Sequence, residues 1–267
     1  QCKAEAELQG AHAVAPWIVA WDDHEVANDD WSGGAENHQV NEGAWAERKR
    51  AALQAYYEWM PIREPAPGRA FEAINRSFQF GDLATLIMLE TRLLARTKQL
   101  DYATDMPIAM QRWDFTHAGA PVALRDGEPD TAAMRLLPAI YEDVGGQLQP
   151  VLDWRRAGAM VQNPRNLPQG FFIAPDNAEL THRLSAPERT MLGPAQEQWL
   201  GQELAGSKSA ESVWQVLGSQ TVMAPVAAPD LSRTPGPLAA ALERLRPGAT
   251  QLLKLTRFPF PLNTDAW

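Results

Sequence analysis

The order of apolar and polar residues predicts a strand, a helix and a hairpin in the first third of the chain. The apolar run 16–21 is typical of a short buried strand, because it stops abruptly at two aspartates. Residues 41–60 carry aromatic and apolar side chains on one helical face and charged side chains on the other, and Pro61 ends this helix. Segments 76–80 and 83–89 are predicted to be strands joined by a Gly-Asp turn, which is a hairpin pattern.

The rest of the chain has a weaker pattern. Residues from about 97 to 180 show little periodicity and many turn residues, and so long a segment is typical of a lid or insertion made of substrate-facing loops. A helix beginning near Pro194 is expected next, followed by a strand at 213–217 and a short helix over 238–245. Strands that alternate with helices favour an α/β layered architecture.

Composition narrows the classes of protein that fit. The 267 residues are enough for one large domain with a buried core. The net charge of −9 argues against duplex nucleic acid as a partner, because that binding needs a Lys/Arg surface. Cys2 is the only cysteine, so the chain can form neither an internal disulfide nor a thiolate-rich metal site. No apolar run is long enough to span a membrane.

Acidic and imidazole side chains are concentrated directly after the first predicted strand. They are Asp22, Asp23, His24 and Glu25, followed by Asn28, Asp29 and Asp30. In open α/β sheets, ligands bind outside the carboxyl ends of the strands. Carboxylate and amide oxygens suit hard cations such as Ca²⁺, Mg²⁺ or Mn²⁺, and an imidazole beside them can act as a metal ligand or a general acid. The alternative is a solvated acidic loop that caps the following helix.

The stretch from Pro16 to Asp29, together with 34–38, resembles the signature of the alkaline phosphatase D (PhoD-like) family of metal-dependent phosphoester hydrolases. That signature is similar to the Gly-Asn-His-Asp/Glu block of the wider metallophosphatase superfamily, in which the residue before His ligates a metal and the His lies near the leaving group. The resemblance therefore implies that Asp23 is a metal ligand and His24 the catalytic residue. It makes Asp22 and Asn28 further candidate metal ligands, with Glu25 as a supporting group beside them.

Four further stretches resemble the family and extend the match from about Leu8 to Trp267. They are residues 45–61, 80–92, 191–200 and 214–218. The family's upstream Gly-Asp-x-x-Tyr block and downstream Gly-Asp-x-His block do not occur in their expected places, so the chain is expected to be the central part of the catalytic domain, incomplete at both ends. Cys2 does not lie where the family's metal-binding cysteine would be, and that role is not carried over to it.

The resemblance implies a metallophosphatase-like α/β sandwich that hydrolyses phosphomonoesters or phosphodiesters with metal-activated water, while His24 protonates the leaving oxygen. It also implies Ca²⁺ with Fe³⁺ as cofactors, a small-molecule phosphoester as substrate, and a periplasmic or extracellular location. The isolated fragment is expected to be inactive, because most ligands of a multinuclear site are missing. Two alternatives stay open: a truncated, non-catalytic relic with at most one weak cation site, and a lipid-directed phosphodiesterase.

Arg92, which follows the second strand of the predicted hairpin, is the candidate substrate-binding residue. A guanidinium is well suited to clamp a phosphate. Equally, Arg92 could pair with Glu90 or Asp82 on the surface, which would make it a structural residue.

Overall fold

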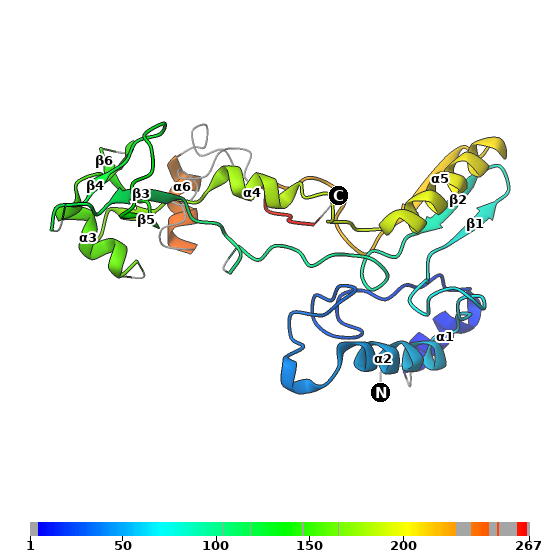
Figure 1. Cartoon of the computed structure of the whole chain (residues 1–267). Coiled ribbons are helices and arrows are strands. Elements are labelled where there is room, and N and C mark those ends of the chain that lie inside the picture. The colour runs from blue at the N-terminus through cyan, green and yellow to red at the C-terminus, as the bar shows by residue number, and fades with distance from the viewer. Residues whose placement is uncertain are drawn as a thin grey trace. The chain divides into compact units, whose positions relative to one another are not determined.

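The computed structural model of the protein describes residues 5–102, 104–117, 119–145, 147–164, 166–227, 236–245, 250 and 261–265 (Figure 1). The chain divides into two units. The first comprises Gln1–Gln99, Pro187–Ala224 and Asp265–Trp267, and the second comprises Leu100–Ala186 and Pro225–Thr264. Among the described residues, the helices are all too short or too polar to cross a membrane.

Among its described residues, the first unit contains a small mixed sheet and four α- or 3₁₀-helices. Its elements are α1 (Ala6–Val14), η2 (Val40–Glu42), α2 (Trp45–Trp59), β1 (Arg76–Phe80), β2 (Ala84–Met88), α5 (Gly193–Ser209) and β9 (Trp214–Gly218). β1 and β2 form the expected antiparallel hairpin, turning at Gly81 with a φ of 57°. β9 pairs in parallel with β2. Parallel strands need a crossover connection, and α5, which lies alongside β2, forms part of it (Figure 1).

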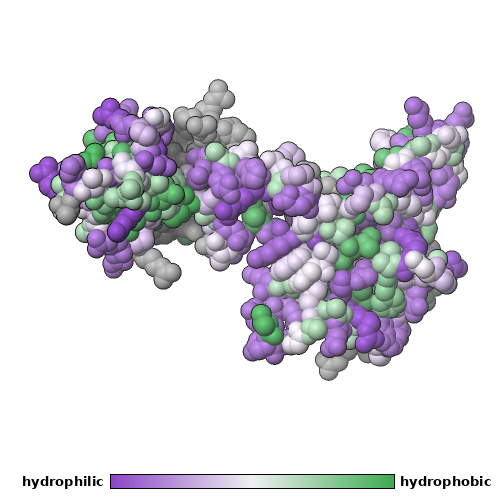
Figure 2. Space-filling view, in the orientation of Figure 1, coloured by the Kyte–Doolittle hydropathy of each residue, from purple (hydrophilic) through white to green (hydrophobic). Residues whose placement is uncertain are grey.

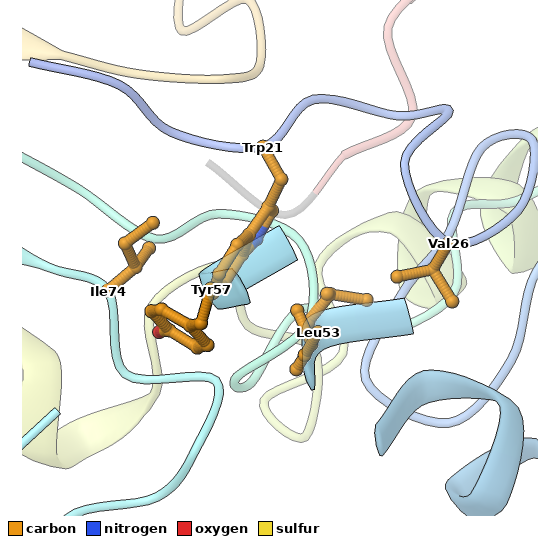
Figure 3. Packing of buried hydrophobic residues seen from close by; sticks show 6 residues of the cluster. Trp21, Val26, Leu53, Tyr57 and Ile74 are labelled. Carbon is orange, nitrogen blue, oxygen red and sulfur yellow. The ribbon is translucent and has the colours of Figure 1, made fainter. Parts of the chain in front are cut away.

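Apolar side chains from α2 and from the loops around it form the core beside the acidic block. α2 ends at Trp59, two residues before the proline that was expected to stop it, and buries Leu53 and Tyr57. Trp21 packs edge-on against Tyr57, with the ring centroids 6.2 Å apart (Figure 3). The buried members of this cluster are Trp21, Val26, Leu53, Tyr57, Ile74 and Leu93. The residue directly before the acidic block is therefore anchored in the core.

The second unit is richer in strands than its sequence pattern indicates. Its elements are β3 (Met110–Asp114), β4 (Val122–Ala123), β5 (Met134–Pro138), β6 (Ile140–Val144), β7 (Gln147–Pro150), α3 (Trp154–Gln162), β8 (Phe171–Ile173), α4 (Asn177–Leu184) and α6 (Gly236–Leu245). Its strands form two three-stranded sheets, β4-β3-β5 and β7-β6-β8. Trp113 and Ile140 are buried in a core of its own. A role as a lid or insertion stays a prediction.

Residues 16–21 do not form the predicted strand. They have no regular secondary structure and pair with no strand of the described chain. An apolar run becomes a strand only when neighbouring backbone groups complete its hydrogen bonds. Within this run, the carbonyl of Val19 accepts a hydrogen bond from a side chain, the Arg76 guanidinium.

The expected layered sandwich is not confirmed. The structure is mixed α/β, and its three sheets have three strands each within the described residues. β9 leaves Trp214 63% exposed and Val216 46% exposed, whereas a layered sandwich would cover such side chains. Elsewhere, on the face shown in Figure 2, hydrophobic residues form small patches among hydrophilic ones.

The first core should depend strongly on Leu53. Its side chain is 1% exposed, so Leu53→Ala should lower the free energy of unfolding by about 2–5 kcal/mol. Val40→Ala is the matched control: Val40 is fully exposed, and its truncation should change stability by less than about 0.5 kcal/mol. Urea unfolding of both variants measures the difference, and equal effects would contradict this account of the core.

Candidate functional site

The acidic block lies on a loop that follows Trp21 and is closed by two short-range hydrogen bonds. The backbone N–H of Asp22 donates to Glu25 Oε2 at 2.6 Å, and the N–H of Asp29 donates to the carbonyl of Asp23 at 2.9 Å. Asp29 adopts a φ of 48°, a left-handed conformation that Asp tolerates better than most residues. Asp22, His24 and Glu25 are exposed, while Asp23 is partly buried. The loop therefore presents some of its acidic groups to solvent and turns others inward.

The structure brings Asp23, His24 and Arg92 together. His24 Nε2 lies 3.4 Å from Asp23 Oδ1, and Arg92 Nη2 lies 3.9 Å from Asp23 Oδ2. The His24 side chain is 72% exposed and can exchange protons with solvent, whereas the Arg92 side chain is 9% exposed. One carboxylate thus stands between an accessible imidazole and a buried guanidinium.

Arg92 is neither a surface residue nor paired with the carboxylates expected from the sequence. Its Nη1 donates to Asp29 Oδ1 at 2.8 Å. Its contact with Glu90 runs through the backbone, since the N–H of Arg92 donates to Glu90 Oε1 at 3.1 Å. The carboxylates of Asp23 and Asp29 already balance the charge of Arg92, and phosphate binding by this residue stays a prediction.

A second buried arginine contacts the same carboxylate oxygen of Asp29 as Arg92 does. Arg96 is 2% exposed, and its Nη1 lies 3.3 Å from Asp29 Oδ1 and donates to the carbonyl of Asp30 at 2.7 Å. Its Nη2 donates to Asp265 Oδ1 at 2.7 Å. Gln99 donates a further hydrogen bond to Asp29. Because buried charges are costly unless paired and hydrogen-bonded, these contacts fix the end of the acidic loop in one position.

Glu90 connects the acidic loop to the turn that carries Arg92. Its side chain is fully buried, and Oε1 accepts a 2.8 Å hydrogen bond from the indole of Trp21. The backbone N–H groups of Arg92, Leu93 and Leu94 also donate to this carboxylate. Burial raises the pKa of Glu90, and these hydrogen bonds partly offset the shift. The same side chain thus anchors the residue before the acidic block and shapes the turn opposite it.

Asp30 is the least satisfied polar group of the region. It is fully buried, and both of its carboxylate oxygens lack a hydrogen-bond partner among the described residues. Burial raises the pKa of Asp30 to about 7, although the nearby charges of Arg92 and Arg96 lower it. A buried carboxyl without a partner favours its neutral form, because the charged form has lost its water.

The residues expected to hold a metal do not fit a metal centre by themselves. The side-chain amide of Asn28 donates to Glu36, and Asp23 faces a guanidinium, which repels a cation. Within the part of the chain that the structure describes, no three His, Cys, Asp or Glu side chains are placed to share one ion. The assignment of Asp22, Asp23 and Asn28 as metal ligands therefore stays a prediction.

Sequence reasoning noticed Asp29 and Asp30 but gave them no role, and it missed Arg96 and Gln99. Asp29 holds both buried arginines, and its partners lie 63 and 67 residues further along the chain. No local pattern in the sequence indicates pairs at that separation. The positive φ of Asp29 likewise depends on the folded loop.

Comparisons with known proteins agree with the resemblance seen in the sequence. The profile of the family described as PhoD-like phosphatase matches residues 1–267. Alkaline phosphatase D of Bacillus subtilis (strain 168) is 43% identical over 93 residues, which cover 34% of this chain and 16% of that protein. A solved structure of PhoD is 27% identical, with a TM-score of 0.41, and the match covers 79% of this chain and 26% of that one. The matches therefore span only a small part of these two longer relatives.

The raised pKa of Asp30 predicts a pH-dependent stability. The folded protein holds the Asp30 proton up to about pH 7, whereas the unfolded chain releases it near the ordinary value of 3.8. Stability therefore falls as the pH rises through this window. Relative to Asp30→Asn, the wild type should lose about 2–3 kcal/mol in free energy of unfolding between about pH 5 and about pH 8. Urea titrations of both proteins across this range provide the measurement.

The control is Asp22→Asn, which removes an exposed carboxylate from the same loop and should change stability by less than about 0.5 kcal/mol. A difference between wild type and Asp30→Asn that stays constant with pH would show that the Asp30 carboxyl is not desolvated as described.

Proposed function

Because the chain belongs to the PhoD-like phosphatase family, we propose that the full-length protein hydrolyses phosphomonoesters or phosphodiesters and that this chain supplies part of the reaction site. The observation that supports the proposal most directly is that His24 and Arg92 both contact the carboxylate of Asp23. His24 Nε2 lies 3.4 Å from Asp23 Oδ1, and Arg92 Nη2 lies 3.9 Å from Asp23 Oδ2. It combines a proton donor, its orienting carboxylate and a positive charge, which are groups that phosphoester cleavage requires.

In the proposed reaction His24 donates a proton to the leaving oxygen. A general acid must reach its substrate, and the exposed imidazole meets this condition. Asp23 lies close enough to orient the ring. Arg92 supplies a fixed positive charge behind Asp23, which reduces the repulsion between the acidic loop and an anionic phosphate.

The family resemblance also implies metal ions, with Ca²⁺ and Fe³⁺ as the expected pair. The described residues do not converge on one cation, so no step is assigned to a metal here. We infer that activity needs residues in addition to those of this chain. The alternative of a non-catalytic relic is favoured by the same observation, that the described metal-ligating side chains do not meet at one cation. Activity of the full-length protein distinguishes the enzyme from the relic.

Replacing His24 tests the role of general acid in the full-length protein. A general acid helps most when the leaving group is poor, so His24→Ala should slow an alkyl phosphoester by roughly 10²–10⁴-fold and a nitrophenyl phosphoester much less. Asp23→Ala should slow both substrates together and lower the bound metal per chain if Asp23 is a ligand as predicted. The measurements are two rates and the metal content of each variant.

His182→Ala is the matched control, since His182 is 77% exposed and belongs to the second unit. It should leave both rates unchanged. Equal losses on the two substrates for His24→Ala would exclude proton donation by this residue, and an inactive full-length wild type would support the relic. The isolated chain, assayed in parallel, is expected to turn over far below the ~10 s⁻¹ of ordinary enzymes.

A further inference from the structure

A cavity of about 730 Å³ opens in the first unit, apart from the acidic block. Its walls come from segment 16–18, the proline-rich segment 61–66, Arg69, segment 73–75 and the strand β1. This volume lies within the ~300–1,000 Å³ typical of small-molecule sites. The walls contain many apolar side chains, including Trp17, Ile18, Pro61, Ile62, Phe78 and Phe80. Trp17 and Phe80 remain 41% and 50% exposed, which is costly for aromatic side chains in water.

Three arginines line the same cavity, while Glu64 is its one acidic lining residue. None of Arg63, Arg69 and Arg76 forms an ion pair with a carboxylate of the described residues. This is notable in a chain whose net charge is −9, where carboxylates outnumber cations. Arg69 donates to the side-chain oxygen of Asn75 at 2.6 Å and to its carbonyl at 3.4 Å, and both acceptors are neutral. The positive charge of the three arginines is therefore not balanced by an ion pair among the described residues.

Arg76 is the most buried of these three arginines. Its guanidinium donates to the carbonyl of Val19 and lies 5.8 Å from the centre of the Phe78 ring. Its Nε is buried and has no hydrogen-bond partner among the described residues. Burial also lowers the pKa of Arg76. A partly buried guanidinium without an ion-pair partner is stabilised by a carboxylate or phosphate, which accepts hydrogen bonds from it.

We propose that this cavity binds a small amphiphilic anion, with its phosphate or carboxylate at the arginines and its apolar body against the aromatic and proline walls. The apolar walls alone would accept a neutral molecule, and the arginines alone would accept inorganic phosphate. The combination selects a ligand that has both parts. Asp22, Asp23, His24 and Glu25 do not line the cavity, so this binding does not depend on the proposed hydrolysis.

Isothermal titration calorimetry with octyl phosphate tests the proposal on the whole chain. A chelator in the buffer removes metal ions, so that binding at a metal-assisted reaction site is not measured. We expect saturable binding of one octyl phosphate per chain, and at least about tenfold weaker binding of octanol and of inorganic phosphate, since each lacks one of the two contacts. Octanoate distinguishes a carboxylate headgroup from a phosphate. Equal binding of octanol and octyl phosphate would overturn the proposal.

Two pairs of variants locate the binding. Arg63→Gln and Phe80→Ser alter the cavity, and each should weaken octyl phosphate binding about tenfold, because one charge-assisted contact or one apolar wall is lost. Arg50→Gln and Leu83→Ser are the controls: both side chains are exposed in the same unit and neither lines the cavity. Equal effects of cavity and control variants would show that binding occurs elsewhere. If the chain bound phosphatidic acid vesicles but showed no saturable binding of octyl phosphate, the proposal of a small ligand would be wrong and the partner would be a membrane surface.

Discussion

The buried carboxylate of Glu90 is the interaction on which the candidate site depends. It accepts hydrogen bonds from the indole of Trp21 and from three consecutive backbone N–H groups, those of Arg92, Leu93 and Leu94. Its own backbone is held by a pair of 2.8 Å hydrogen bonds with the side chain of Gln196 on α5. Burying a carboxylate costs much less free energy when its oxygens accept hydrogen bonds in this way. The sheet, the core and the acidic loop therefore meet at one side chain.

This constraint explains how several charged side chains are held in fixed positions beside the core. The turn shaped by Glu90 directs Arg92 toward Asp29 and Asp23, and Arg96 contacts the same oxygen of Asp29 as Arg92 does. Removing one partner from such a buried network lowers the free energy of unfolding by more than the intact ion pair adds to it, because the remaining charge is left without a partner. The network is thus better suited to fixing the loop in one arrangement than to adding stability. It leaves His24 as the accessible group at the edge of a fixed set of charges.

Local patterns predicted α2, the β1–β2 hairpin and α5, because the hydrophobic period, the turn glycine and the helix-starting proline all lie within each segment. The cluster from Asp22 to Glu25 was also visible as an acidic block with one imidazole. The local sequence could not show whether residues 16–21 form a strand, since strand formation also depends on neighbouring strands that these residues do not specify. The pairing of Arg92 and Arg96 with Asp29 was equally hidden, because it joins distant segments through the folded core.

Hydrogen exchange at the turn after Glu90 tests the central claim most directly. In Glu90→Gln, the backbone N–H groups of Leu93 and Leu94 should exchange at least about tenfold faster than in the wild type, measured against the amides of α2 as an internal reference. They donate to the two different oxygens of Glu90, and Gln replaces one of these acceptors by an NH₂ donor. Glu203→Gln is the control, since Glu203 accepts a 2.5 Å hydrogen bond from Ser77 in the same unit but does not touch this turn. The account predicts a selective change in Glu90→Gln and none at these amides in the control. Unchanged exchange of Leu93 and Leu94 in Glu90→Gln would contradict it.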